Sequence, residues 1–550
     1  MRYLITLFIM IIIFTGCSNK QEEEKVMLEN KIAQYAVTNV NYDESLLDER
    51  QKIVVQKLYE AAKIMDDLFL EQVYSKNHEI KKKLETSSDE LDKLRLQYFT
   101  INFGPFDRLD ENKPFIEGHT KPDGANYYPE DITKEEFEQW IKDNPNDEKA
   151  FRSEFTVIRR NGNGLVAVPY SEFYKTKLEQ ASKLLLEAAE YADNETLKNY
   201  LTKRAAAFGT NDYYESDMAW MDLKDHAIEV IIGPYEVYED ELFNYKAAFE
   251  CFLTIVDPAE TEKLKIFANY LKEMEDNLPI PNEHKNFDRG SDSPIVVAQE
   301  VFSGGDTKAG VQTLAFNLPN DERVRKAKGS KKVMLKNIHE AKFDKLLYPI
   351  AEKVMDPEQL QYVTFDGFFN HTLMHEMSHG VGPGFIKVDG RDTEVKIELK
   401  ETYSKLEECK ADILGMYNNI LMIEKGVYPK EFENQLWSTF LAGIFRSVRF
   451  GVDAAHGGAN AIIFNYLLEH GAYEYNESTN TVKVNFEKVY GVLQALGTKV
   501  LMIQATGDYD GAKKILADYA VDSPTMQKLK SKLTDLPVDI WPIFEIETNQ

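Results

Sequence analysis

The strongest structural signal in this sequence is a pair of histidines four residues apart. In FFNHTLMHEMSHGVGPG, residues 368–384, His375 and His379 are separated by one helical turn, and Glu376 follows the first histidine. Residues i and i+4 share one face of an α-helix, so both imidazoles can bind one metal ion. Glu376 lies beside that face, where its carboxylate can accept a proton from a metal-activated water. The glycines and proline after His379 indicate that the helix ends there.

A metal site needs a third ligand, because a histidine pair on a helix also arises by chance. Glu408 lies 29 residues after His379, in KLEECKADILGMYNN. Zinc hydrolases commonly take a third, carboxylate ligand from a following helix and leave the fourth position to water. Glu407 and Asp412 can orient the ligating histidines. Alone, these acids would indicate a solvated helix start. With the histidine pair upstream, they predict one zinc ion per chain on His375, His379 and Glu408.

Length and composition limit the class of protein. A chain of 550 residues is too long for one compact core and indicates two or three lobes. Its 43% hydrophobic and 12% aromatic content is typical of a folded globular protein. The formal net charge is −27. We expect no nucleic-acid binding, because phosphate recognition requires a basic surface.

The amino terminus, MRYLITLFIMIIIFTGCSNKQEEE, has the pattern of a bacterial secretion signal. Arg2 precedes an apolar run over residues 3–14, which is too short for a comfortable membrane span. Two small residues then precede Cys17, as in the lipobox of bacterial lipoproteins, although Phe14 stands where leucine is usual.

These residues predict a signal peptide over residues 1–16, lipidation of Cys17 and a short flexible tether over residues 17–25. The alternative is an uncleaved amino-terminal anchor. On either interpretation we expect an exported, membrane-anchored protein in the periplasm or at the cell surface. No other segment is long and apolar enough to cross a bilayer.

Two further cysteines follow Cys17, at Cys251 and Cys409. One disulfide between them is possible, but two cysteines are not a disulfide framework. The core must therefore come from packing.

The first half of the chain is predicted to contain both helices and strands. Residues 26–100 are helical by the spacing of their apolar positions, and residues 101–150 contain several turn signals. FTVIRRNGNGLVAVPY, residues 155–170, predicts a hairpin that turns at Asn161–Gly164. Residues 171–207 return to a helical pattern.

The second half becomes progressively helical. We expect a strand in residues 227–243, AIEVIIGPYEVYEDELF, that turns at Gly233–Pro234. Residues 281–345 mix loops with short strands, and residues 346–540 are almost all helix.

These patterns predict a predominantly helical α+β protein with two lobes around a cleft. We assign residues 26–255 and 300–345 to a mixed α/β lower lobe. Residues 256–299 and 346–550 form the helical, zinc-binding catalytic lobe.

HEMSHG together with EECKAD resembles the dipeptidyl peptidase III family of zinc peptidases, in its bacterial and plant branch. Three further segments resemble that family in the same order: IGPYEVYEDELF with Glu236 and Tyr238, FNLPND with Asn317 and Asn320, and DAAHGGANAIIFNYLLEHG with His456. The matches span residues 95 to 545, which covers most of the chain.

The resemblance implies zinc-dependent release of dipeptides from the amino terminus of short peptides. Glu376 would pass the proton of the attacking water to the leaving amine. His456 and Tyr238 would donate hydrogen bonds to the developing oxyanion. From the residues alone, a histidine beside two glycines is more often structural.

The resemblance also implies a substrate-binding group. Glu236 would pair with the free ammonium of the peptide, and Asn317 and Asn320 would hold the backbone beside it. From spacing alone, PYEVYEDE is an acidic surface turn in which Glu236 is one solvated charge among several.

The chain departs from the family pattern in several places. Many members have a histidine motif one residue longer, and Asn460 stands where many have arginine. The chain ends soon after LPVDIWPIFEI, without the last part of the usual lower lobe. Plant relatives carry a fused Nudix domain, but this sequence has no Nudix box, so we expect no nucleotide hydrolysis.

Two other functions remain open at this point. One is a zinc peptidase of different specificity, either an aminopeptidase or an endopeptidase. The other is a non-catalytic, tethered zinc-binding lipoprotein, which Glu376 argues against because a structural zinc needs no general base. The sequence does not determine the natural peptide, the membrane leaflet or the oligomeric state.

Overall fold

The structure is a computed structural model that describes residues 20–287 and 294–548. The chain divides into two compact units. Unit 1 comprises Met1–Pro258, Ser293–Ile338 and Trp541–Gln550, and unit 2 comprises Ala259–Asp292 and His339–Ile540. The predicted signal peptide and Cys17 lie outside the described residues. Within the described ranges, no helix has both the length and the apolar character that a membrane crossing requires.

Unit 1 is built around a five-stranded sheet with the order β6-β7-β8-β10-β9. The strands are β6 (Ile228–Glu236), β7 (Ala248–Val256), β8 (Ile295–Gly305), β9 (Ala315–Leu318) and β10 (Lys331–Leu335). β10 pairs with β8 in parallel, and the other pairs are antiparallel. β6 and β7 bury every residue except the last, which is typical of strands covered on both faces.

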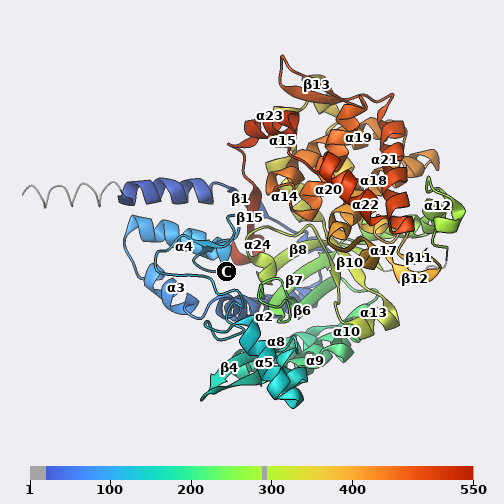
Figure 1. Cartoon of the computed structure of the whole chain (residues 1–550). Helices are drawn as coiled ribbons and strands as arrows, with labels where there is room; N and C mark the ends of the chain where they lie inside the picture. Colours follow the sequence, from blue (N-terminus) through green and yellow to red (C-terminus); the bar gives the residue numbers. More distant parts are fainter. Residues whose placement is uncertain (1–19, 288–293, 549–550) are drawn as a thin grey trace, which may run out of the picture. The chain divides into compact units, whose positions relative to one another are not determined.

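Helices cover this sheet and extend unit 1 beyond it (Figure 1). The long helix α2 (Glu49–Val73) packs on β7 and β8 and also contacts α8. Its start is fixed by a capping box, in which Asp48 accepts from the backbone of Gln51 and the Gln51 side chain accepts from Asp48 N–H. Other helices of this unit include α3 (Asn77–Glu85), α4 (Glu90–Asn102), α8 (Lys175–Tyr191), α9 (Glu195–Thr210), α10 (Tyr214–Met221) and α13 (Glu322–Lys328).

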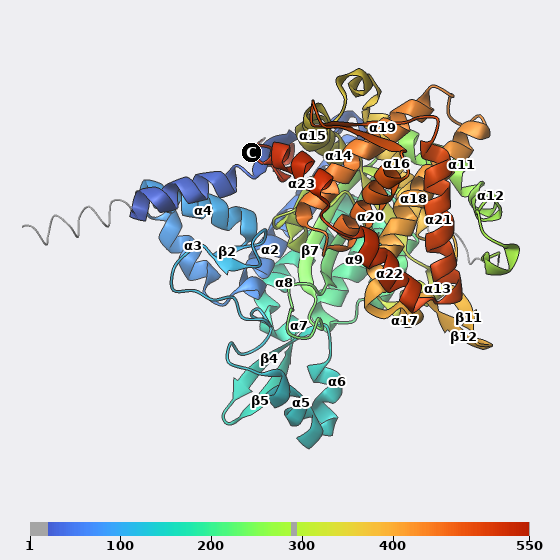
Figure 2. The same cartoon turned by 45° about the horizontal axis from the view of Figure 1, so that its top comes forward.

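The predicted hairpin is confirmed. β4 (Thr156–Asn161) pairs with β5 (Gly164–Pro169), and Asn161 lies opposite Gly164 at the turn. The hairpin lies with α5 (Lys134–Asp143) and α6 (Glu148–Phe151) at one end of unit 1 (Figure 2).

Unit 2 is a helical assembly centred on α18 (Tyr403–Glu424), which packs against several neighbouring helices (Figure 2). These neighbours are α16 (Phe365–Ser378), α19 (Phe432–Ser447), α20 (Ala455–Glu469) and α21 (Val489–Thr506). Further helices are α11 (Pro258–Ala268), α12 (Leu271–Asp276), α14 (Lys336–Lys342), α15 (Tyr348–Val354), α22 (Tyr509–Tyr519) and α23 (Pro524–Lys530). Two short hairpins complete the unit: β11 (Phe385–Val388) with β12 (Arg391–Glu394), and β13 (Tyr473–Asn476) with β14 (Thr481–Val484).

The predicted fold class, predominantly helical α+β with two parts, is confirmed. Two local predictions are wrong. β6 does not turn at Gly233–Pro234 but continues to Glu236. β6 is an edge strand, where proline is tolerated because an outward-facing N–H is not needed. Residues 35–40, inside the predicted helical region, form strand β1 (Tyr35–Val40).

Both ends of the described chain also differ from prediction. Residues 20–32 form a helix, so the tether predicted over residues 17–25 is helical from residue 20 onward. β15 (Asp539–Phe544) pairs with β1, and the chain from Trp541 belongs to unit 1 rather than to the helical lobe. The alternating burial of β15 shows why this segment forms a strand.

The possible disulfide does not form in this structure. Cys251 lies in unit 1 and Cys409 lies in unit 2, and both are buried free thiols.

Candidate active site

Helix α16 presents the histidine pair. The side chain of Thr364 caps its start and accepts the N–H of Gly367 at 3.2 Å. The helix ends at Ser378, and His379 is its C-cap residue. Gly415 on α18 allows the two helices to approach closely, because a Cβ there would lie 3.0 Å from the backbone nitrogen of His375.

The three predicted metal ligands converge. One ligand atom from each of His375, His379 and Glu408 lies within 4.8 Å of the others. Oε2 of Glu408 is 3.3 Å from Nε2 of His375 and 3.7 Å from Nε2 of His379. That oxygen is buried and makes no hydrogen bond within the described residues, although Nδ1 of His456 also lies 3.2 Å from it. A buried, unsatisfied carboxylate oxygen facing two imidazole nitrogens is what a bound cation would complete. The donor set fits zinc.

Two carboxylates hold the other nitrogens of these histidines. Oδ1 of Asp412 is 2.7 Å from Nδ1 of His375, and Oε1 of Glu407 is 2.9 Å from Nδ1 of His379. When Nδ1–H donates to a carboxylate, the Nε2 lone pair is left to face a metal ion. Both acids were predicted to orient the histidines, and the geometry fits that role.

Glu407 has a charged partner that was not predicted from the sequence. The buried ammonium of Lys410 lies 2.7 Å from Oε1 of Glu407 and donates to the carbonyls of His379 and Val381. Gln504 donates to the second oxygen of Glu407 at 3.0 Å. Burial opposes the ionisation of Glu407, but Lys410 and His379 outweigh it and lower its pKa to about 2.

His371 lies one turn before His375 but belongs to the core. Its ring packs at a tilt of 48° against Phe440 with centroids 4.6 Å apart, and Nε2 lies 3.3 Å from the carbonyl oxygen of Asp412. Burial lowers the pKa of His371 to about 4, although nearby Asp412 opposes the change. It is not one of the three converging ligands.

The two predicted catalytic residues of unit 2 lie at this cluster. Glu376 is half-buried on α16, next to His375 in the chain. His456 lies in the first turn of α20, and its Nδ1 is 3.2 Å from Oε2 of Glu408. Its side chain remains 63% exposed, so the ring is accessible to a substrate.

The two glycines after His456 have a structural reason. A Cβ on Gly457 would lie 1.9 Å from the carbonyl oxygen of Gly451, and one on Gly458 would lie 2.7 Å from that of Val452. Any larger residue would push the start of α20 away from this loop. The glycines therefore fix the position of His456.

The predicted substrate-binding residues belong to unit 1, and two of them are in contact. Nδ2 of Asn320 donates to Oε1 of Glu236 at 3.2 Å and to the carbonyl oxygen of Tyr235 at 3.3 Å. Asn317 is exposed on β9. Tyr238 follows β6 and is 74% exposed. Glu236 and Asn320 thus form a polar group at the end of β6.

Two further acids lie near Glu236 that the sequence reasoning missed. Glu250 is 2% exposed on β7, and burial followed by repulsion from Glu236 and Asp306 raises its pKa well above the usual range. Burial also raises the pKa of Asp306 to about 7. A glutamate inside the apolar strand AFECFLTIV is the sequence signal that could have identified Glu250.

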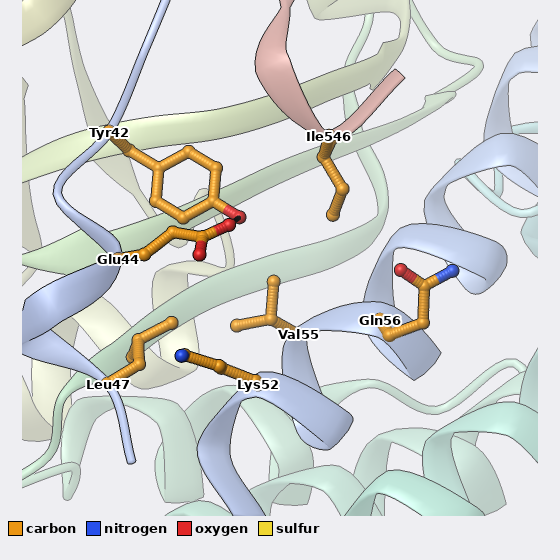
Figure 3. A pocket seen from close by; sticks show the side chains of 7 residues that line it. All are labelled: Tyr42, Glu44, Leu47, Lys52, Val55, Gln56 and Ile546. Atoms are coloured by element: carbon orange, nitrogen blue, oxygen red, sulfur yellow. Dashed lines mark hydrogen bonds between the residues drawn. The ribbon is translucent and has the colours of Figure 1, made fainter. Parts of the chain in front are cut away.

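A cavity of about 150 Å³ elsewhere in unit 1 is separate from all these residues (Figure 3). Its lining comprises Tyr42, Glu44, Leu47, Lys52, Val55, Gln56 and Ile546. It contains none of the predicted site residues and no histidine, so it is not the peptidase site.

Comparisons with known proteins place this geometry in a family. Residues 146–399 match the model described as Peptidase family M49. The solved structure of DPP III from Caldithrix abyssi is 67% identical, with a TM-score of 0.94, and the match covers 95% of this chain and 99% of that one. Dipeptidyl-peptidase III from Corallococcus sp. strain EGB is 44% identical, with a TM-score of 0.81 and coverage of 95% and 97%.

A plant protein is also similar over nearly the whole length. Nudix hydrolase 3 of Arabidopsis thaliana is 38% identical over 590 residues, which cover 97% of this chain and 76% of the plant protein. These matches, and the convergence of His375, His379 and Glu408 beside Glu376, lead to one conclusion. The chain is a metallopeptidase that belongs to peptidase family M49, the family of dipeptidyl peptidase III.

Proposed function

We propose that this protein is a zinc-dependent exopeptidase that releases dipeptides from the amino terminus of short peptides. The observation that carries this proposal is the converging group of His375, His379 and Glu408. It occurs in a chain whose solved relatives are named dipeptidyl peptidase III.

One zinc ion per chain, held by His375, His379 and Glu408, is the proposed cofactor. When bound, it supplies a Lewis acid that polarises the scissile carbonyl and lowers the pKa of the attacking water. Asp412 and Glu407 keep both histidines in the tautomer that can bind the ion.

Glu376 is the proposed general base. It accepts a proton from water as the water oxygen bonds to the scissile carbonyl carbon, and it delivers that proton to the amine nitrogen as the C–N bond breaks. His456 and Tyr238 are the proposed donors to the carbonyl oxygen as negative charge develops on it.

Dipeptide release requires a fixed distance between the substrate ammonium and the scissile bond. Glu236 is the proposed ammonium partner, through a charge-assisted hydrogen bond. Asn320 supports this role because its amide already contacts the Glu236 carboxylate and so orients it. Asn317 is the proposed second amide contact with the peptide backbone.

The protein is proposed to act as an exported lipoprotein anchored through Cys17. This proposal rests on the apolar run over residues 3–14 and the small residues before the cysteine. Short peptides outside the cytoplasm would then be its substrates.

Hydrolysis of dipeptidyl-arylamides by purified protein tests the proposed activity. We expect release of the arylamine that stops with a zinc chelator and returns when zinc is restored. Aminoacyl-arylamides serve as the matched control, because a single-residue substrate cannot place its ammonium at the required distance. Preferred cleavage of aminoacyl-arylamides would instead indicate an aminopeptidase.

A further inference from the structure

Asn460 connects the metal-binding histidine to the helix that carries His456. It lies on α20, one turn after His456, and is 5% exposed. Its Nδ2 donates to Oδ2 of Asp412 at 2.9 Å and to the carbonyl oxygen of His456 at 2.9 Å. The amide thus uses both of its N–H donors, one toward α18 and one within its own helix.

Asp412 is the middle member of this chain of contacts. Its Oδ1 faces Nδ1 of His375 at 2.7 Å, so its two oxygens serve two different partners. Asp412 is 6% exposed, and its carboxylate needs both hydrogen bonds to be satisfied in a buried position. A fixed carboxylate fixes the plane of the His375 ring and hence the direction of its Nε2.

The other histidine is held differently. Glu407 is paired with the ammonium of Lys410, which supplies a full positive charge. On the Asp412 side, the corresponding donor is the neutral amide of Asn460. Asn460 therefore supplies a directional hydrogen bond, and no charge, to the second oxygen of Asp412.

We infer that Asn460 is a positioning residue that couples the zinc ligand His375, through Asp412, to the helical turn that presents His456. This inference rests on the proposed zinc site. A purely local role is the alternative, in which the amide only satisfies the carbonyl of its own helix four residues back.

Asn460→Leu separates these two roles, because leucine has the same branched side-chain skeleton and lacks both donors. We expect zinc affinity, measured by chelator competition, to fall about tenfold, the lower end of the range for residues that orient metal ligands. Asn418→Leu is the matched control. Asn418 is a buried amide on α18 that donates to Ser378 at 3.0 Å and, within the described residues, is hydrogen-bonded to neither carboxylate. We expect its zinc affinity to remain within about twofold of the original protein.

A double-variant cycle shows whether Asn460 acts through Asp412. If it does, Asn460→Leu has less than about a twofold effect on zinc affinity once Asp412→Ala is present. An equal tenfold loss in both backgrounds would overturn the coupling, as would unchanged affinity in Asn460→Leu alone. Thermal unfolding of each metal-free variant checks that the fold is intact. Asn460→Gln is a second variant, which keeps the amide group.

The unsubstituted protein is measured in parallel, which separates this inference from the proposed function. If that protein binds no zinc, the proposed function fails. If it binds zinc and Asn460→Leu binds equally well, only the role of Asn460 fails. At saturating zinc, we also expect kcat of Asn460→Leu to fall more than KM rises, because His456 is the proposed hydrogen-bond donor to the reacting carbonyl.

Discussion

Oδ1 of Asp412 lies 2.7 Å from Nδ1 of His375, across the contact between α18 and α16. The carboxylate is buried, and the pairing holds its pKa at about 2 against the opposing effect of burial. Asp412 therefore stays ionised at neutral pH and holds the His375 ring with Nε2 toward Glu408.

Asp412→Ala should weaken zinc binding without abolishing it. Three ligands remain, but His375 loses the contact that sets its tautomer, so we expect affinity to fall roughly 10- to 100-fold. Chelator competition measures the loss. Unchanged affinity would mean that Asp412 only fills a buried position.

Glu376→Gln should separate metal binding from catalysis. Glu376 is next to His375 in the chain but is not one of the converging ligand atoms. We expect one zinc per chain to remain by elemental analysis, while kcat falls about 100- to 10,000-fold through loss of the general base. Loss of the metal together with activity would contradict this role.

Asp306→Asn should change how stability depends on pH. Burial, with repulsion from Glu239 and Glu236, raises the Asp306 pKa from 3.8 to about 7, although Arg108 opposes this. The neutral carboxyl contributes stability that is fully present below pH 3.8 and is lost as the pH rises through about 7. Asparagine cannot ionise. The unfolding temperature of Asp306→Asn should therefore exceed that of the original protein by a difference that grows from pH 4 to 7 and stays constant above pH 7.

Differential scanning calorimetry in the presence of chelator measures this difference without a contribution from bound metal. Glu322→Gln is a suitable control, since Glu322 is an exposed side chain in the first turn of α13. If the difference in unfolding temperature between Asp306→Asn and the original protein stays constant between pH 4 and 8, Asp306 titrates normally.

Cys17→Ser tests the proposed tether. Lipid attachment requires the thiol, so we expect the variant to appear as soluble or unprocessed protein instead of in the membrane fraction. Fractionation after metabolic labelling with a fatty acid distinguishes these forms. Full membrane partitioning of a signal-cleaved variant would contradict lipidation at this residue.

The cluster that could hold a metal ion was predictable because its residues are close together in sequence. His375 and His379 share a helix face by spacing alone, and Glu408 follows on the next long helix in a recognisable motif. The hairpin at Asn161–Gly164 was predictable for the same reason, since its turn residues determine its geometry.

Long-range pairing was not predictable in the same way. The strand β6 passes through Gly233–Pro234 because it lies at a sheet edge, and that position depends on the partner strand β7. The link from Asn460 to Asp412 joins residues 48 positions apart. An asparagine inside a helical pattern gives no indication of which carboxylate it will contact.

Mass spectrometry of peptide digests decides whether the protein releases dipeptides from a free amino terminus. The substrates are an octapeptide with a free amino terminus and the same peptide acetylated there. We predict successive loss of dipeptides from the free peptide. Acetylation should lower kcat/KM by about 100-fold, because it removes the charge that pairs with Glu236 and leaves that carboxylate without its partner. Equal cleavage of both peptides, or a ladder of single residues, would contradict the dipeptidyl peptidase assignment.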